Sequence, residues 1–383
     1  MRTLISGGTL ITPNEVLPDH TLVIDGSRIA RIEPRPLREA GPEERTIDAR
    51  GLWVIPGLID IHVHGSCGYD TMDATPEALY GMARFLAQHG VTSYLPTTIA
   101  AAPEAIRAAV EAVARCPQPA DGAHHLGLHL EGPYLNPEHR GAQPREQLRA
   151  PDAAEYGDWL ASGVVRLITV APELEGALAL IERGALQGVE FAAGHSGATY
   201  EQMLRAVDCG LRQATHTFNG MAGLHHREPG TAGAVLADER IYAQVIGDGV
   251  HVHPAMVKVL IRAKGVGRTI LITDAMRAAG MGDGAYDLGG QTVWVRGGIA
   301  RTATGGLAGS SLTLDAAVRN VMRFAGLSLG QSVAMASAVP AEAMGMAGKK
   351  GTLAPGADAD VVLLGADLDV RLTMVAGHVV YQQ

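Results

Sequence analysis

Short apolar runs recur through the middle of the chain, and each is bounded by glycine, proline or polar residues. Runs of this length, rich in Val, Ile, Leu and Ala, are typical of strands that are buried on both faces. The pattern predicts eight such strands, at residues 58–64, 91–98, 124–131, 164–170, 189–195, 211–217, 241–248 and 268–274.

Between most of these runs, the apolar residues follow a helical spacing instead. The clearest case is residues 75–90, TPEALYGMARFLAQHG, where Thr75 is a capping residue and Pro76 takes the first helical position. The apolar face of this segment consists of Leu79, Met82, Ala83 and Leu86. Gly90 marks the end of the predicted helix.

Alternating strands and helices over this length predict an α/β fold, namely a (β/α)8 barrel over residues 57–349. An open doubly wound sheet is the alternative, but no glycine-rich nucleotide-binding motif follows the first strand. Residues 283–303 have the pattern of a hairpin that is inserted after the eighth strand.

The two ends of the chain have a different pattern. Residues 2–56 and the last 33 residues are short strands separated by turns, and Asp25-Gly26 predicts a hairpin. We expect the two ends to pair into a small β-sandwich domain, which is discontinuous and comprises residues 1–56 and 350–383.

Composition excludes several classes of protein. A formal charge of −9, without a run of Lys or Arg, argues against binding to nucleic acid or to an anionic membrane. The three cysteines are widely spaced and predict reduced thiols in the cytoplasm. The first residues read as a strand rather than a signal peptide, and no apolar stretch reaches membrane-spanning length.

Polar residues gather where the predicted strands end. They are His62, His64, Glu131, His195, His216 and Asp274. A single histidine in an apolar strand is more often a buried core residue, but all six lie at the end of the barrel where active sites form. Imidazole and carboxylate together suit Zn²⁺, Fe²⁺ or a similar ion, so we predict a metal site. The pairs His124-His125 and His225-His226 lack this placement and are predicted to lie on the surface or in loops.

Several motifs resemble the amidohydrolase superfamily. They are PGLIDIHVHG, HLEGPYLNP, GHSGAT, THTFNGM, REPG, DGVHV and ITDAM. Within this superfamily they look most like the N-acetylglucosamine-6-phosphate deacetylases, because HLEGP places a glutamate ligand on the third strand. Other amidohydrolases commonly use a carboxylated lysine after strand four, and LITVAPE has no lysine there.

The resemblance implies an enzyme that hydrolyses the acetamide of a small phosphorylated amino sugar, and it implies a homodimer. By this resemblance, Glu131, His195 and His216 hold the main metal, and Asp274 is the catalytic acid/base. The implied substrate-binding residues are Ala142, Gln143, the backbone N–H groups of Asn219 and Gly220, Arg227, His251, Leu307, Ala308 and Gly309.

Two features vary within this family. Some members have other residues at the positions of His62 and His64 and use one metal, so this chain is expected to bind one or two ions. Zinc is expected, with iron, cobalt and manganese as alternatives. Gln143 stands where some members have a histidine, and glutamine cannot shuttle a proton. The alternative functions are another amidohydrolase, which acts on a different N-acyl or cyclic amide, and a non-catalytic barrel.

Overall fold

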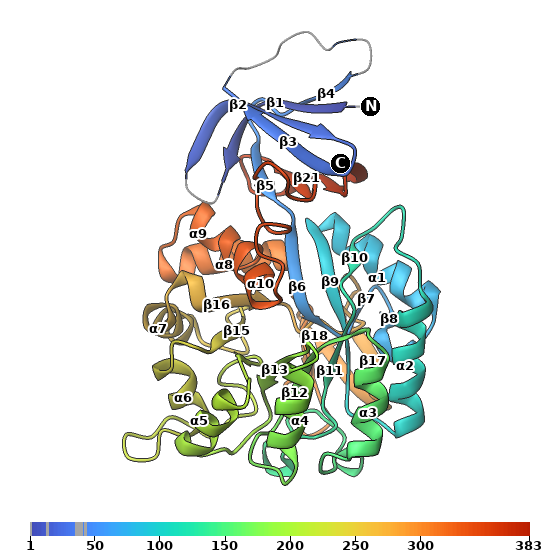
Figure 1. The fold of residues 1–383 in the computed structure, drawn as a ribbon, viewed down its shortest axis with the longest axis vertical. Helices are drawn as coiled ribbons and strands as arrows, with labels where there is room; N and C mark the ends of the chain where they lie inside the picture. Colours follow the sequence, from blue (N-terminus) through green and yellow to red (C-terminus); the bar gives the residue numbers. More distant parts are fainter. Residues whose placement is uncertain (1, 13–14, 35–40, 42–43) are drawn as a thin grey trace.

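The computed structural model describes residues 2–12, 15–34, 41 and 44–383. Figure 1 shows a barrel of strands surrounded by helices, with a smaller β-sheet domain at one end. The predicted fold class is therefore confirmed. Among the described residues, no helix is long and apolar enough to cross a membrane.

Parallel strands form the barrel, and each of the eight predicted runs contains one or two of them. The strands are β6 (Leu58–Val63), β9 (Val91–Thr98), β10 (His124–His125), β11 (Leu128–Glu131), β12 (Val165–Val170), β13 (Glu190–Ala193), β14 (Gln213–Ala214), β15 (Tyr242–Ile246) and β16 (Thr269–Ile272). The third predicted run is split into β10 and β11, because Gly127 has a φ of +122° and interrupts the ladder. Carboxyl ends of all these strands point to the same end of the barrel, away from the small domain (Figure 1).

Helices cover the outside of the barrel. They are α1 (Pro76–Gln88), α2 (Pro103–Arg115), α3 (Ala153–Ala161), α4 (Ala177–Ala185), α5 (Tyr200–Asp208), α6 (Gly230–Ala237), α7 (Pro254–Lys264), α8 (Leu314–Ala325), α9 (Leu329–Ala334) and α10 (Ala338–Ala343). Short 3-10 helices are η1 (Thr71–Asp73), η2 (Pro137–His139), η3 (Arg145–Gln147) and η4 (Val266–Arg268). The prediction for residues 75–90 is confirmed, since the Thr75 hydroxyl accepts a hydrogen bond from the Ala78 N–H and the predicted apolar face is buried.

The barrel closes between its first and last strands, β6 and β16, at a junction that we call the seam. Near the start of these strands, the backbone of Met335 and Ala336 fills the seam by accepting hydrogen bonds from Leu271 and Ile59. Near their carboxyl ends, the strands meet directly, through N–H bonds from Asp274 to His62 O and from His64 to Ala275 O. The buried Asp60 carboxylate also accepts a 2.6 Å hydrogen bond from the Thr273 hydroxyl across the seam.

Both ends of the chain contribute to the small domain, as predicted. Its strands are β1 (Arg2–Ile11), β2 (Val16–Asp25), β3 (Arg28–Glu33), β4 (Glu44–Asp48), β5 (Trp53–Pro56), β20 (Val361–Leu364), β21 (Val370–Val375) and β22 (His378–Gln382). They are hydrogen-bonded in the order β22-β21-β20-β5-β1-β2-β3, with β4 beside β1. The two ends of the chain therefore meet where β20 pairs with β5, and side chains from both halves share one hydrophobic cluster. The domain limits at residues 56 and 350 stay a prediction, and residues 1, 13–14, 35–40 and 42–43 of that range lie outside the described residues.

A single residue, Gly57, connects the small domain to the barrel, between β5 and β6. Its N–H donates to the Asp360 carbonyl at 2.9 Å, and a Cβ at this position would lie 2.1 Å from the Thr92 hydroxyl oxygen. Only glycine therefore fits between β5 and β6. The short connection holds the start of β6 against the small domain.

The predicted insertion at 283–303 is confirmed as an antiparallel sheet of β17 (Gly284–Leu288), β18 (Gln291–Arg296) and β19 (Ile299–Arg301). A smaller pair, β7 (Gly65–Ser66) and β8 (Tyr69–Asp70), follows β6. The β17–β18 turn reaches the loop beyond β11, where the Gln291 amide donates to the Ala142 carbonyl. The insertion therefore forms part of the wall at the carboxyl end of the barrel.

Candidate metal-binding active site

A pocket of about 140 Å³ lies at the carboxyl ends of the barrel strands. It is lined by His64, Ile99, Glu131, Gly141, Ala142, Gln143, His195, His216, Asn219, Gly220, His251, Asp274, Leu288, Leu307 and Gly309. Twelve of these residues are predicted site residues, so the sequence identified most of the pocket. The sequence missed Ile99, Gly141 and Leu288, which carry no polar side chain that would have marked them.

Glu131 is the centre of the site. Its Oε1 lies 3.0 Å from His216 Nε2, 3.2 Å from His195 Nε2 and 3.6 Å from His62 Nε2. Its Oε2 lies 3.3 Å from His64 Nε2. Two groups of three ligand atoms result, His62/His64/Glu131 and Glu131/His195/His216, with Glu131 common to both. All of these side chains are buried, so four imidazole rings take the place of solvent around one carboxylate.

The two groups differ in how their histidines are supported. His195 Nδ1 lies 3.0 Å from the His139 carbonyl, and His216 Nδ1 lies 3.2 Å from the Asn219 carbonyl. A carbonyl can only accept, so each Nδ1 is protonated, and Nε2, which faces Glu131, is the nitrogen left to coordinate a metal. For His62 and His64, Nδ1 has no hydrogen-bond partner among the described residues. The donor set of both groups fits a divalent metal ion. Only in the Glu131/His195/His216 group are the histidine rings also held in orientation by backbone carbonyls.

Burial disfavours the protonated forms of His64 and His216, but hydrogen bonds to Asp274 and Glu131 raise the pKa of His64 well above its usual value, and Glu131 raises the pKa of His216. These two rings would therefore lose a proton when a metal binds. The ionisation of His62 and Glu131 already suits a metal. Burial lowers the pKa of His62 to about 4, so its imidazole is neutral at neutral pH. Burial alone would favour the protonated form of Glu131, but the histidines, with His62 first, hold the pKa of its carboxyl well below the usual range. Neutral imidazole and ionised carboxylate are the forms that coordinate metals.

Asp274 lies at the edge of this cluster. Its Oδ1 is 3.2 Å from His64 Nε2 and 3.4 Å from His62 Nε2, and the residue lines the pocket. Burial raises the pKa of its carboxyl, but His62 and then His64 outweigh this effect and lower the pKa to about 2. Asp274 is therefore an ionised carboxylate beside the predicted metal ligands, which is the state that a base needs.

Three site residues have a left-handed backbone. His195, His216 and Asp274 each come two residues after a strand ends, and their φ angles are +48°, +30° and +50°. This conformation costs roughly 1–2 kcal/mol for a residue with a side chain. The same departure from strand geometry after β13, β14 and β16 turns these side chains toward the common centre.

Gln143 contacts Glu131 directly. Its amide nitrogen donates to Glu131 Oε2 at 2.5 Å, and its amide oxygen accepts from the Ala100 N–H at 2.8 Å. The sequence predicted contact with the substrate at this position, and the pocket does include Gln143. In the structure, however, both polar ends of its side chain are occupied, and one of them orients the central carboxylate.

The predicted substrate-binding residues differ in whether their donor groups are already hydrogen-bonded and in whether they line the pocket. The Asn219 N–H donates to the His216 carbonyl at 2.9 Å, whereas the Gly220 N–H has no backbone acceptor among the described residues. His251 lines the pocket, and its Nδ1 lies 2.6 Å from Asp248 Oδ2, which orients the ring. Arg227 is exposed, its guanidinium lies 2.8 Å from His226 Nε2, and it is not among the described lining residues.

The remaining predicted residues lie close to the pocket or away from it. His62 is fully buried behind the pocket wall, and Ala308 is buried in a hydrophobic cluster with Ile99 and Leu288. His225 and His226 are exposed, as predicted. The predicted surface or loop position is wrong for His124 and His125, which are half-buried in β10 and pair with β9, because the third predicted strand begins there.

Glu173 is a residue of the site region that the sequence did not identify. Its carboxylate accepts from the Asn136 side chain at 2.9 Å, from the Gly197 N–H at 2.6 Å and from the Ser196 hydroxyl at 2.7 Å. It therefore ties the loop after Glu131 to the loop after His195. A signal was present, since Glu173 follows the fourth strand, but nothing in the sequence showed its three partners.

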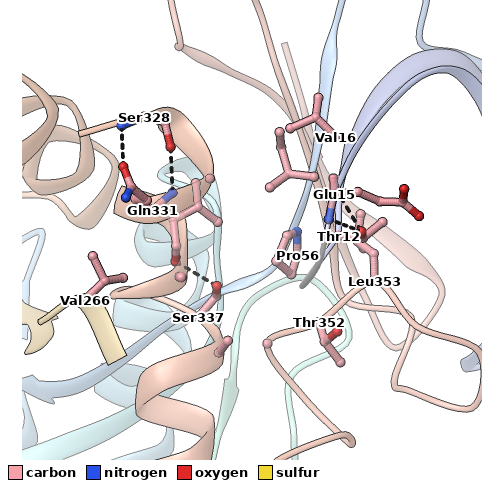
Figure 2. Close-up of a pocket in the computed structure, with 16 residues that line it drawn as sticks. Thr12, Glu15, Val16, Pro56, Val266, Ser328, Gln331, Ser337, Thr352 and Leu353 are labelled. Carbon is pink, nitrogen blue, oxygen red and sulfur yellow. Dashed lines mark hydrogen bonds between the residues drawn. The ribbon is translucent and has the colours of Figure 1, made fainter. Parts of the chain in front are cut away.

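A larger pocket, of about 420 Å³, lies between the small domain and the barrel (Figure 2). Most of its lining is apolar, and among the described residues that line it, Glu15 carries the one ionisable side chain. None of the predicted site residues is among them. The side chains that can bind a metal or transfer a proton therefore line the smaller pocket, at the other end of the barrel.

Comparison with known proteins identifies a matching family and several similar deacetylases. Residues 53–380 match the Amidohydrolase family. The chain is 43% identical to an N-acetylgalactosamine-6-phosphate deacetylase of Escherichia coli O157:H7, over 99% of both chains. It is also 43% identical to an N-acetylglucosamine-6-phosphate deacetylase of Vibrio furnissii, over 86% of this chain and 83% of the relative. A solved structure of a mutant N-acetyl-D-glucosamine-6-phosphate deacetylase from Mycobacterium smegmatis, in complex with N-acetyl-D-glucosamine-6-phosphate, is 35% identical and matches with a TM-score of 0.91 over 100% of both chains.

Proposed function

Since the chain belongs to the amidohydrolase family, we propose that it hydrolyses the acetamide of N-acetylglucosamine 6-phosphate and releases glucosamine 6-phosphate and acetate. The observation that carries this proposal is the cluster of His62, His64, His195 and His216 around Glu131, with Asp274 at its edge. The deacetylases that this chain is similar to support the same substrate class.

The metal is expected to be zinc, held first by Glu131, His195 and His216. A second ion would use His62, His64 and again Glu131, which is the carboxylate common to both groups. When bound, a divalent ion supplies positive charge that lowers the pKa of water and polarises the acetyl carbonyl.

The side chains of this protein supply the proton transfers. Asp274, ionised at neutral pH, accepts a proton from the water that attacks the amide carbon. It then returns this proton to the nitrogen of the departing amine, because an amine anion is too poor a leaving group to depart unprotonated. Gln143 holds one oxygen of Glu131 in place during both steps.

Recognition of the sugar phosphate is assigned to the residues that line the pocket beside the predicted metal ligands. The Gly220 N–H, which has no backbone acceptor among the described residues, is the best-placed donor, and His251, Leu307 and Gly309 line the space beside it. Arg227 is proposed to add a charged contact to the phosphate, although this exposed side chain must move, or act from a second subunit, to reach it. A homodimer in the cytoplasm also stays a prediction.

The test is acetate release by zinc-loaded protein from three substrates, namely N-acetylglucosamine 6-phosphate, N-acetylgalactosamine 6-phosphate and unphosphorylated N-acetylglucosamine. We expect the highest kcat/KM for the first substrate. A higher kcat/KM for the galactosamine epimer would contradict the assigned sugar and leave the deacetylase chemistry intact. Acetate release from none of the three would favour another amidohydrolase, or a non-catalytic barrel if the protein also holds no metal.

A further inference from the structure

A layer of buried polar side chains lies next to the predicted metal ligands and has no part in the proposed chemistry. It consists of Thr97 on β9, His129 on β11, Thr169 on β12 and Thr215 just after β14, and we call it the threonine–histidine layer. Each of these residues is fully buried, with 0% of its surface exposed. Polar groups are costly to bury unless they are hydrogen-bonded, so their arrangement needs an explanation.

The hydrogen bonds of this layer run in one direction. The Thr97 hydroxyl donates to the Leu95 carbonyl at 3.1 Å, so it can only accept from His129 Nδ1, 3.2 Å away. His129 Nε2 must then accept from the Thr169 hydroxyl at 2.8 Å. Thr169 in turn accepts from the Thr215 hydroxyl at 2.7 Å. Both ring nitrogens of His129 are therefore engaged by threonines, so neither is available to coordinate a metal.

One end of the layer supports the His62/His64 group. The Thr97 hydroxyl also accepts from the Val63 N–H at 3.0 Å, and Val63 lies between the two histidines on β6. The His129 ring meets the His62 ring edge to face, with 4.7 Å between the ring centroids. Because His62 Nδ1 has no hydrogen-bond partner among the described residues, this ring contact is a major restraint on its orientation.

The other end of the layer supports the second group. His129 precedes Glu131 by two residues on β11, so both side chains point into the barrel. Thr215 directly precedes His216. Gly194, which precedes His195, packs on the same threonines, since a Cβ there would lie 2.6 Å from Thr169 Cγ2 and 2.9 Å from Thr215 Cβ. The layer therefore contacts His62 and directly precedes His216, and it reaches His64 through Val63, His195 through Gly194 and Glu131 from two residues away on β11.

We infer that the threonine–histidine layer positions the ligands of both metal-binding groups, and that His129 is its central positioning residue. The inference rests on the proposed metal site and extends it to residues that do not touch the metal. Groups that orient metal ligands typically change metal affinity by about 10- to 100-fold when they are removed. His129→Phe keeps a ring against His62 but removes both hydrogen bonds, so it should weaken binding by about that factor.

The experiment measures the Zn²⁺ dissociation constant of the full-length protein by competition with a chelator, and the thermal stability of the metal-free protein. His129→Asn serves as the conservative variant, because its amide nitrogen can replace the Nδ1–H donor to Thr97. His125→Phe is the matched control, since His125 also lies in a barrel strand and bonds through Nε2 to the Cys116 carbonyl, outside the layer. We expect a large loss of affinity in His129→Phe, a smaller one in His129→Asn and none in His125→Phe.

Equal zinc affinity in the wild type and His129→Phe, or an equal loss in His125→Phe, would overturn the inference. If His129→Phe does not fold, Thr169→Val breaks the same chain with almost no change in volume. Unchanged zinc affinity in that variant would likewise overturn the inference. A wild-type protein that binds no zinc would instead contradict the proposed metal site, so the two failures are distinguishable.

Discussion

Replacing Glu131 should affect both metal-binding groups at once. Its two oxygens lie within 3.6 Å of a nitrogen of each of the four histidines, so Glu131→Ala takes one ligand from each group. His62→Ala and His195→Ala each take one ligand from a single group. The three variants therefore separate a shared ligand from two unshared ones.

The size of the effect follows from the number of ligands. A zinc site with four ligands is worth about 10–16 kcal/mol at neutral pH, or about 3 kcal/mol for each ligand. That energy corresponds to roughly 150-fold in the dissociation constant. Glu131→Ala should therefore weaken both sites by about two orders of magnitude, whereas His62→Ala should weaken one site and leave the other near its normal affinity.

The assay is zinc content per chain, measured by mass spectrometry after dialysis against a series of buffered free zinc concentrations. We expect two ions in the wild type, one in His62→Ala and none in Glu131→Ala at concentrations that saturate the wild type. Glu131→Gln is the matched control, because it keeps the volume and one neutral oxygen while it loses the charge.

Two results would refute this reasoning. A wild type that saturates at one ion, with no change in His62→Ala, would remove the second site. A Glu131→Ala protein that retains two ions while its near-UV spectrum remains native would show that Glu131 is not the shared ligand.

Three further variants test other residues. Asp274→Asn should fold and bind metal but lower kcat by at least about 10²-fold, the usual scale for losing a general acid/base, and near-normal turnover would contradict the mechanism. Arg227→Ala should lower kcat/KM for N-acetylglucosamine 6-phosphate by roughly 10- to 150-fold and leave the unphosphorylated sugar unaffected, so equal losses would mean a structural role. Burial lowers the pKa of Lys264 to about 8, so wild-type stability should rise from pH 8 to 10 as the folded state loses this proton before the unfolded state does. Urea unfolding should accordingly show the stability of the wild type relative to Lys264→Met, which also lacks the hydrogen bond from Lys264 to the Asp238 carbonyl, to increase by about 1 kcal/mol between pH 7 and pH 10, and a constant difference would contradict the assigned pKa.

The sequence predicted the barrel well because its strands are buried on both faces. Such strands are nearly continuous apolar runs, and the apolar pattern stops where the polar site residues begin, as at Glu131 and Asp274. Position at a strand end was therefore enough to bring these residues together. The split of the third strand was missed, because the sequence does not show that Gly127 adopts a φ of +122°.

Contacts between distant segments were beyond the sequence. The bond from Gln143 to Glu131 depends on how the loop after β11 folds back over the site, and neither residue type specifies that path. The Asn219 N–H donates to the His216 carbonyl in a local turn that the sequence did not show, and its role toward the phosphate stays a prediction. Arg227 illustrates a third limit, since a motif can mark a residue without showing whether its side chain reaches the pocket.

The seam gives this barrel a preferred line of local opening. Every other pair of adjacent barrel strands shares a ladder of at least two residue pairs, whereas β6 and β16 meet through a few hydrogen bonds near His64 and Asp274. Fluctuations along this line would separate the acid/base from two predicted ligands while the other strands stay paired. A molecule that contacts both sides of the seam would suppress such fluctuations by mass action. Gentle heating of the free protein should therefore abolish catalysis before it melts the barrel, so activity and global unfolding are expected to report different temperatures.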